Sequence, residues 1–312
     1  MTISSAPTVR KAWAAITVIV ALGTAASAPI VRGQGLRPMS FLDMRLMRTV
    51  ETPTPSPDGK WLLYTLSTPD WKEAKSQTDI YLVSMAQGVA STRQMSYSKN
   101  RNESLPRWAR DGRAFFFLSN REAPESTPSL NQIYLMRPDG GEPQRITDTK
   151  EGVRDYALGR DGRWLTYRTG KDGEEQLYRL AISGIEGAAP EQLTKHPTGI
   201  GTWKWSPDSK RIYFVSPDAL DKDDKERREK KFTVNIRNES RPSASLWALD
   251  LEPVATRKLS DGTAYAATTP VISEDGKWVA FKGQSLNRYQ RNITQEGLYE
   301  DVYLLDATTG RI

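Results

Sequence analysis

One histidine is the residue of this chain best suited to acid–base chemistry. His196 lies in Thr194-Lys195-His196-Pro197 and is the only histidine among 312 residues. A histidine within hydrogen-bond reach of a serine can activate that serine as a nucleophile. No G-x-S-x-G sequence occurs, however, so the strained turn that would present such a serine is missing. We therefore interpret His196 as a loop residue and predict no catalytic residue in this chain.

The remaining groups with ligand chemistry are carboxylates, and their spacing does not indicate a metal site. The chain has no cysteine, which excludes disulfides and thiolate-bound metals. The densest charge run, Asp221 to Lys231, does not follow the D-x-[DN]-x-[DN]-G pattern of a calcium loop. No glycine-rich phosphate loop is present. The sequence thus predicts no metal and no cofactor.

Residues 1–33 differ in composition from the rest of the chain. Arg10 and Lys11 precede an apolar run from Ala12 to Ala28, and small residues follow it. This layout is typical of a secretory signal peptide, and it predicts a periplasmic or secreted bacterial protein. The alternative is an uncleaved membrane anchor, because the segment from Ala12 to Val31 is 20 residues long, enough to span a bilayer. Contact with a membrane is expected only in that case.

The basic charge of the chain lies partly in this N-terminal segment. The formal net charge is +6, and residues 1–33 contain three cations and no acid. The remainder mixes both signs, which favours solubility and argues against a nucleic-acid partner.

A five-residue turn recurs at intervals of about fifty residues, which indicates an array of similar supersecondary units. Each copy centres on an Asp followed by Gly or Ser and then a cation. The copies are Ser56-Pro57-Asp58-Gly59-Lys60, Ala109-Arg110-Asp111-Gly112-Arg113, Gly159-Arg160-Asp161-Gly162-Arg163, Ser206-Pro207-Asp208-Ser209-Lys210 and Ser273-Glu274-Asp275-Gly276-Lys277. Asp-Gly supplies the positive backbone angles of a tight hairpin, so the flanking segments are expected to pair antiparallel.

Three landmarks accompany the turns in constant order. Each turn precedes a continuous apolar run, which is typical of a strand covered on both faces. The second landmark is an aromatic residue between apolar ones, at Tyr81, Tyr134, Tyr178, Trp247 and Tyr303. The third is an apolar residue followed by Ser or Thr, at Met95-Ser96, Ile146-Thr147, Leu193-Thr194 and Leu259-Ser260. With a strand before each turn and one at each landmark, residues 34–312 are predicted to form an all-β propeller of four-stranded, WD-repeat-like blades.

Two features adjoin the blades. Phe41 to Met47 has the spacing of a short amphipathic helical turn leading into the first blade. The fifth unit lacks its third landmark before Ile312, so we interpret the chain as truncated within a blade, by a natural truncation or as a gene fragment. A β-sandwich with accidental similarity is the disfavoured alternative.

Three stretches resemble the N-terminal propeller of the prolyl oligopeptidase family of serine peptidases, of the secreted dipeptidyl-peptidase and acylaminoacyl-peptidase type. They are Met44 to Val50 running into Pro55 to Trp61, then Ser67 to Lys72 leading to Asp79 to Val83, and the charged insert Asp221 to Lys231 closing on Ser245 to Asp250. The resemblance implies that the propeller restricts access of peptides to a separate α/β-hydrolase domain that holds the Ser, Asp and His. That domain is absent from this sequence, so the chain alone is expected to hydrolyse no peptide.

The resemblance leaves two functions open. The first is a substrate-gating propeller whose partners are peptides or the missing hydrolase domain. The second is a stand-alone, TolB-like periplasmic propeller that binds a protein. The insert Asp218 to Pro242 either lines the substrate entrance or forms a solvated loop or helix face, and the solvated interpretation is favoured.

Several short motifs are interpreted as structural or accidental. Trp108, Trp203 and Trp205 precede a turn and are expected to pack within blades. Asn102, Asn238 and Asn292 each begin an N-glycosylation acceptor pattern, which is common by chance.

Overall fold

The computed structural model describes residues 37–185, 187–220, 222–230, 243–262, 265–285 and 300–312. The chain divides into two compact units, Met1–Phe41 and Leu42–Ile312. All of the described strands lie in the second unit. The predicted signal peptide, residues 1–33, lies outside the described residues.

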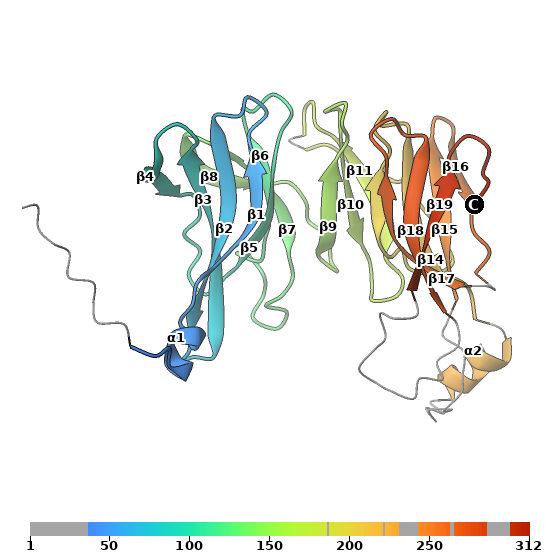
Figure 1. The fold of residues 1–312 in the computed structure, drawn as a ribbon, viewed down its shortest axis with the longest axis horizontal. Coiled ribbons are helices and arrows are strands. Elements are labelled where there is room, and N and C mark those ends of the chain that lie inside the picture. Colours follow the sequence, from blue (N-terminus) through green and yellow to red (C-terminus); the bar gives the residue numbers. More distant parts are fainter. Residues whose placement is uncertain (1–36, 186, 221, 231–242, 263–264, 286–299) are drawn as a thin grey trace, which may run out of the picture. The chain divides into compact units, whose positions relative to one another are not determined.

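Within the described residues the strands form five antiparallel sheets in which neighbours in sequence are neighbours in the sheet (Figure 1). We call these sheets blades 1 to 5. Blade 1 contains β1 (Thr49–Pro55), β2 (Trp61–Asp70), β3 (Lys75–Ser84) and β4 (Gly88–Gln94); blade 2 contains β5 (Glu103–Trp108), β6 (Phe115–Ser119), β7 (Gln132–Arg137) and β8 (Gly140–Arg145); blade 3 contains β9 (Val153–Leu158), β10 (Trp164–Thr169), β11 (Gln176–Ala181) and β12 (Glu191–Gln192). Blade 4 contains β13 (Trp203–Trp205), β14 (Arg211–Pro217), β15 (Ala244–Leu251) and β16 (Val254–Lys258), and blade 5 contains β17 (Tyr265–Ile272), β18 (Trp278–Ser285) and β19 (Glu300–Asp306). This is the predicted arrangement of propeller blades.

Each Asp-Gly turn joins the first two strands of its blade. In the first copy the Gly59 N–H donates to Ser56 O (2.9 Å), and the Asp58 carboxylate accepts from Ser56 Oγ and Lys60 N at 2.6 and 3.1 Å. The hydrogen bond from Ser56, followed by that from the Lys60 backbone, holds the pKa of Asp58 below its ordinary value. Only the glycine adopts a positive φ, +69° at Gly59. The loop is therefore a five-residue turn closed by its aspartate, and the predicted antiparallel pairing of the segments on either side of it is confirmed.

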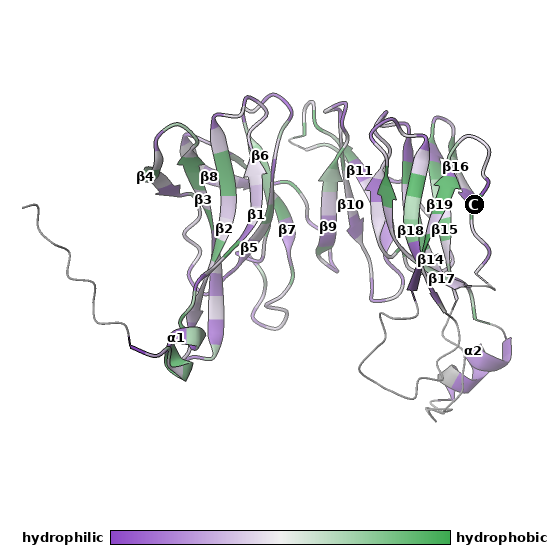
Figure 2. Cartoon of the chain, viewed as in Figure 1, coloured by the Kyte–Doolittle hydropathy of each residue, from purple (hydrophilic) through white to green (hydrophobic). Residues whose placement is uncertain are grey.

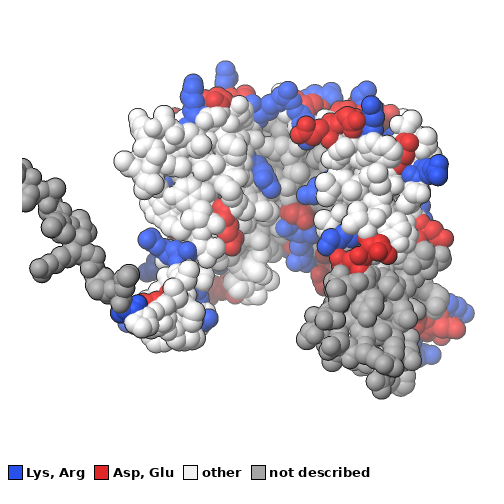
Figure 3. Space-filling view, in the orientation of Figure 1, with Lys and Arg blue, Asp and Glu red and all other residues white. Residues whose placement is uncertain are grey.

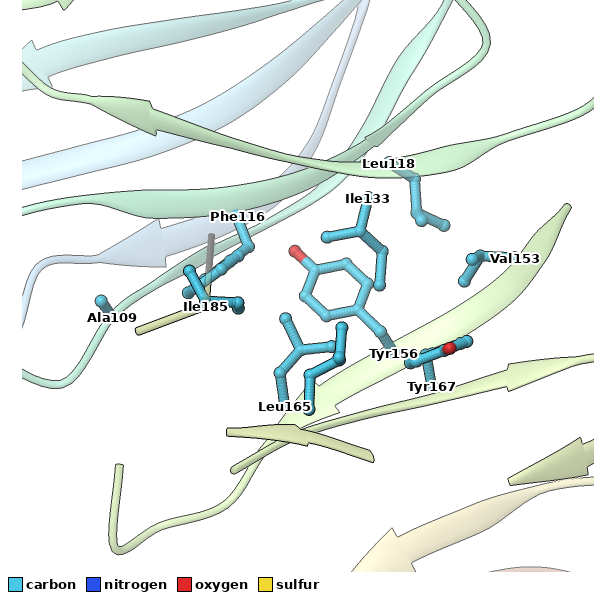
Figure 4. Packing of buried hydrophobic residues seen from close by; sticks show 10 residues of the cluster. Ala109, Phe116, Leu118, Ile133, Val153, Tyr156, Leu165, Tyr167 and Ile185 are labelled. Atoms are coloured by element: carbon cyan, nitrogen blue, oxygen red, sulfur yellow. The ribbon is translucent and has the colours of Figure 1, made fainter. Parts of the chain in front are cut away.

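The hydrophobic core lies between consecutive blades. Every residue of β6 is buried, as expected for a strand covered on both faces. On one side Phe116 and Leu118 pack with Tyr156 and Leu165 of blade 3 (Figure 4). On the other side Phe115 and Phe117 join Leu63, Ile80 and Leu82 of blade 1. Figure 2 shows the apolar residues concentrated in the strands, so the continuous apolar runs of the sequence become the contacts between blades.

The third landmark follows the outer strand rather than lying in it. In blade 1, for example, β4 ends at Gln94, one residue before Met95. In each of four blades, the Ser or Thr hydroxyl of the third landmark accepts a hydrogen bond from a backbone N–H of the blade's third strand. The bonds run from Ile80 N to Ser96 Oγ (2.9 Å), from Ile133 N to Thr147 Oγ1 (2.9 Å), from Leu177 N to Thr194 Oγ1 (2.9 Å) and from Leu246 N to Ser260 Oγ (2.8 Å). We call this repeated bond the clasp. It satisfies a buried N–H that the departing outer strand leaves without a ladder partner.

Removing one clasp hydroxyl is expected to destabilise the fold. Thr147 is buried, and its Oγ1 also donates to Gln132 Oε1 at 2.8 Å. The substitution Thr147→Val leaves Ile133 N without this acceptor, so the free energy of unfolding should fall by about 1–3 kcal/mol. Urea denaturation measures the change. Thr127→Val alters an exposed threonine of the same blade and should change stability by less than about 0.5 kcal/mol.

The predicted tryptophans are packing residues. Trp108 and Trp203 are buried in clusters between blades, and Trp205 packs against the second of these clusters. The predicted helical turn is also confirmed as α1 (Phe41–Arg45), although none of its residues is buried. In the part of the chain that the structure describes, no helix is long and apolar enough to span a bilayer.

Candidate interaction surface

Two stretches that the sequence singled out meet at one surface of blade 1. Residues around α1 and residues of the β2–β3 connection line a groove of about 260 Å³. Its lining residues are Met44, Arg45, Met47, Thr49, Ser67, Pro69, Asp70, Trp71, Ala74, Lys75 and Ser76. These belong to Met44–Val50 and Ser67–Lys72, the stretches that carried the family resemblance, or lie just beyond them. We call this groove and its apolar rim the blade 1 surface.

The geometry of the β2–β3 connection places it beside the segment that follows α1. Both strands have ten residues and pair along their whole length, from Trp61↔Ser84 to Asp70↔Lys75. The turn is closed by Asp70, whose Oδ1 accepts from Lys72 N and Glu73 N at 3.1 and 3.2 Å. Thr49 of β1 pairs with Ser67 of β2, and the chain enters β1 directly from the α1 segment. The long hairpin therefore carries Trp71 to the level of Met47.

The blade 1 surface exposes large apolar side chains. Met44, Met47 and Trp71 are 54%, 61% and 52% exposed, and Leu42, Leu46 and Val50 are exposed as well. Figure 2 shows α1 as mainly hydrophobic, and Figure 3 shows few charges over it. Arg45, Asp70 and Lys75 supply charge at the groove. Several exposed apolar side chains around a polar groove are typical of a surface that binds another protein or domain.

The charged insert contains a second helix, α2 (Lys222–Glu229), in the connection from β14 to β15. Its residues are charged throughout and linked by the pairs Lys222–Glu226 and Asp224–Arg227. At its base, Pro217 pairs with Ala244, and Asp218 N donates to Ser243 O (2.9 Å). The sequence favoured a solvated helix face for the insert, and the described residues of α2 are mostly exposed, as that interpretation expects. Residues 231–242 of the insert lie outside the described residues. Like α1, α2 adjoins the end of its own blade that lies away from the Asp-Gly turn (Figure 1).

His196 lies in the connection between β12 and β13 and is half-buried. Its ring stands edge-on to Trp247 and Phe214, with centroids 4.7 and 5.7 Å apart. Nδ1 lies 3.1 Å from both Thr198 Oγ1 and Ser216 Oγ. Ser216 is fully buried and donates to Gly199 O at 2.8 Å, so it is not presented to a substrate. The interpretation of His196 as a structural loop residue agrees with this packing.

His196 is expected to make stability depend on pH. Burial lowers the pKa of His196 below 6.5, against smaller opposing effects of the Thr198 backbone and Asp218. The unfolded chain then binds a proton more readily than the folded chain, so stability is complete above about pH 6.5 and falls as the pH drops below it. Denaturation of the wild type and His196→Asn at pH 5 to 8 measures this. Because the chain has one histidine, equal slopes in the two proteins would contradict the assignment.

The sequence did not identify a buried carboxylate in blade 2. Glu103 is completely buried and accepts hydrogen bonds from Ser96 Oγ (3.0 Å), Ser119 Oγ (3.1 Å) and Arg121 Nη2 (3.2 Å). We call these four residues the Glu103 hub. Neighbouring Asn102 is exposed and its Oδ1 accepts from Thr78 N, whereas Asn238 and Asn292 lie outside the described residues. Glu103 lies within the acceptor pattern Asn102-Glu103-Ser104, which is typical of an exposed loop. The local sequence therefore did not indicate that Glu103 is buried.

Comparison with known proteins agrees with this architecture. No protein-family model matches the chain. Dipeptidyl-peptidase 5 of Porphyromonas gingivalis is 24% identical over 329 residues, which covers 93% of this chain and 44% of that protein. The uncharacterized peptidase YuxL of Bacillus subtilis is 24% identical over 205 residues, covering 55% of this chain and 30% of that protein. The chain thus spans less than half the length of these two peptidases.

Solved structures of low sequence identity show the same fold. The β-propeller domain of the Trilobed protease from Pyrococcus furiosus has a TM-score of 0.54 at 15% identity, covering 83% of this chain and 69% of that one. A prolyl endopeptidase has a TM-score of 0.57 at 13% identity, and the match covers 83% of this chain and 34% of that one. The putative TolB of Agrobacterium tumefaciens has a TM-score of 0.52 at 21% identity, and the match covers 85% of this chain and 79% of that one.

These comparisons define the class of the protein as an all-β propeller of four-stranded blades. The more particular resemblance, to the propeller portion of prolyl oligopeptidase-family peptidases, is confirmed by the sequence similarity to the peptidase relatives. The prolyl endopeptidase shows the same fold.

Proposed function

We propose that this chain is the substrate-gating propeller of a secreted serine peptidase of the prolyl oligopeptidase type. In this proposal the propeller admits peptides and excludes folded proteins, and a hydrolase domain outside residues 1–312 supplies the Ser, Asp and His. Residues 1–33 act as the signal peptide that directs the protein to the periplasm or the medium. The alternative is a TolB-like propeller that binds a protein without peptidase chemistry.

The observation that carries the proposal is the blade 1 surface. It combines two of the three stretches that resemble the peptidase propellers, and it leaves Met47 and Trp71 more than half exposed. Exposed apolar side chains of this kind are typical of a surface that contacts another protein or domain, which supports docking of the propeller on a catalytic domain. The match to dipeptidyl-peptidase 5 across 93% of this chain supports the same reading.

The proposal is tested in the cells that produce the protein. An antibody raised against the chain should precipitate a serine hydrolase that a fluorophosphonate probe labels, on the same polypeptide or a bound one. The double substitution Met47→Glu/Trp71→Glu should reduce hydrolysis of dipeptidyl naphthylamides by about tenfold or more, because it places charge in an apolar contact.

Met85→Glu is the matched control for this experiment. Met85 is 57% exposed and follows β3, outside the blade 1 surface. Its substitution should leave hydrolysis unchanged. Recovery of no labelled hydrolase, or of a bound protein without peptidase activity, would overturn the proposal and favour the TolB-like alternative.

A further inference from the structure

Direct hydrogen bonds join the first strands of successive blades. Trp108 Nε1 of β5 donates to Thr54 O of β1 at 3.0 Å. Tyr156 OH of β9 donates to Leu105 O of β5 at 2.6 Å. Trp203 Nε1 of β13 donates to Asp155 Oδ1 of β9 at 2.6 Å. These bonds hold β1, β5, β9 and β13 side by side, and each of these strands is the edge strand of its sheet.

Three of these edge strands each expose one cation. Arg107 of β5, Arg154 of β9 and Lys204 of β13 are exposed, whereas the other residues of the three strands are buried or half-buried. Arg154 Nε lies 3.9 Å from Glu175 Oε1, yet its side chain remains 43% exposed. Among the described residues no acid forms an ion pair with Arg107 or Lys204. We call these three residues the first-strand cations.

The acids on the same strands are already neutralised. Glu103 of β5 is buried in its hub with Arg121. Asp155 of β9 accepts from Arg168 Nη2 at 2.6 Å and from Trp203. Glu51, on β1, is the exposed acid of the neighbouring first strand. Among the described residues, Arg107 and Lys204 are therefore the first-strand cations that no acid compensates, whereas Arg154 lies beside Glu175. Figure 3 shows Lys and Arg side chains in the recess around β9, with acidic side chains beside them.

We propose that the first-strand cations select extended peptides that carry acidic side chains. This inference rests on the proposed function, because it names the class of peptide that the propeller admits. The first-strand cations lie on neighbouring edge strands, so carboxylates spaced along an extended peptide can complement them. Such charge complementarity mainly determines the specificity and the association rate of binding. Backbone groups on the unpaired side of these edge strands, other than the carbonyls of Thr54, Leu105 and Pro106 that already accept hydrogen bonds, add polar contacts to any extended peptide.

Binding to the 312-residue chain tests the inference without requiring peptidase activity. The probe is a fluorescein-labelled peptide of alternating Ala and Glu, compared with the Ala–Gln and Ala–Lys versions by fluorescence anisotropy. The Glu peptide should bind most tightly, and its affinity should fall as salt is raised. Arg107→Glu/Lys204→Glu should weaken its binding by about tenfold. Arg137→Glu reverses an exposed cation on the third strand of blade 2 and should have no effect.

Several results would overturn the inference. Equal affinity for the Glu and Gln peptides removes the charge selection, and an equal loss in Arg137→Glu makes the effect one of net charge alone. A further contrary result is a single-stranded oligonucleotide that binds as tightly as the Glu peptide and depends equally on Arg107 and Lys204. That result would show that the surface binds polyanions in general rather than acidic peptides. Circular dichroism verifies folding, and Arg107→Gln/Lys204→Gln replaces the reversal variant if that variant fails to fold. Because peptide binding and probe labelling are separate readouts, failure of this inference leaves the proposed function intact and is distinguishable from failure of the proposed function.

Discussion

Replacing Glu103 by alanine is expected to lower the free energy of unfolding by about 3–5 kcal/mol, because it leaves the partly buried Arg121 guanidinium without its counter-charge. The Arg121 side chain is only 14% exposed, so water does not replace the lost carboxylate. Two hydroxyl donors, those of Ser96 and Ser119, lose the same acceptor. Ser96 also provides the clasp of blade 1, so the substitution weakens the junction between blades 1 and 2.

Chemical denaturation at neutral pH measures this loss. Glu142→Ala is the matched control, because Glu142 lies on β8 of the same blade and is exposed. The control should change stability by less than about 0.5 kcal/mol. A loss below about 1 kcal/mol in Glu103→Ala would show that the hub contributes no more than a surface pair.

The same carboxylate has a second, pH-dependent signature. Burial raises the pKa of Glu103 above 4.5, and the charge of Arg121 opposes this rise. The folded chain therefore holds the Glu103 proton more tightly than the unfolded chain. This contribution lowers stability as the pH rises above about 4.5 and through the raised folded pKa. The difference in stability between wild type and Glu103→Gln should follow that trend, and a pH-independent difference would contradict it.

The second large effect is expected at Tyr156, between blades 2 and 3. The ring is buried among Phe116, Leu118 and Leu165 (Figure 4). Its hydroxyl donates a hydrogen bond to Leu105 O. Burial raises the pKa of Tyr156 well above its ordinary value, opposed by nearby Arg107. Tyr156→Ala empties this volume and should cost about 3–5 kcal/mol.

Tyr156→Phe separates packing from hydrogen bonding. It keeps the ring and removes only the donor to Leu105 O, so it should cost about 1 kcal/mol. Thermal or urea denaturation of both variants gives the comparison. Equal losses in the two variants would show that the hydroxyl, rather than the ring, holds blades 2 and 3 together.

Local chemistry explains why the blades could be predicted from sequence. An Asp carboxylate that binds its own turn, as at Asp58, and a glycine with positive φ both act within five residues. The continuous apolar run of β6 is visible because both of its faces are covered. The clasp residues were also visible as a pattern, although the pattern did not reveal that Thr147 accepts from Ile133 N across the sheet.

Contacts between blades could not be predicted in the same way. The bond from Tyr156 to Leu105 O joins strands of different blades, and its acceptor is a backbone carbonyl that no side-chain pattern marks. From the sequence alone, Glu103 is expected at the surface. Its burial depends on Arg121, Ser96 and Ser119, which only the folded chain brings around it. For the candidate surface, the sequence indicated the stretches near Met47 and Trp71, but their meeting at one groove depends on the length of the β2–β3 hairpin.

The base of the α2 connection has a consequence for how this architecture acquires new properties. The ladder from Arg211↔Asp250 to Pro217↔Ala244 closes before the insert begins, and the bond from Asp218 N to Ser243 O seals it. Each doubling of a closed loop costs only about 0.6 kcal/mol of chain entropy. Blade 4 is therefore a point where sequence can be added, removed or exchanged over evolution while the blade beneath remains unchanged.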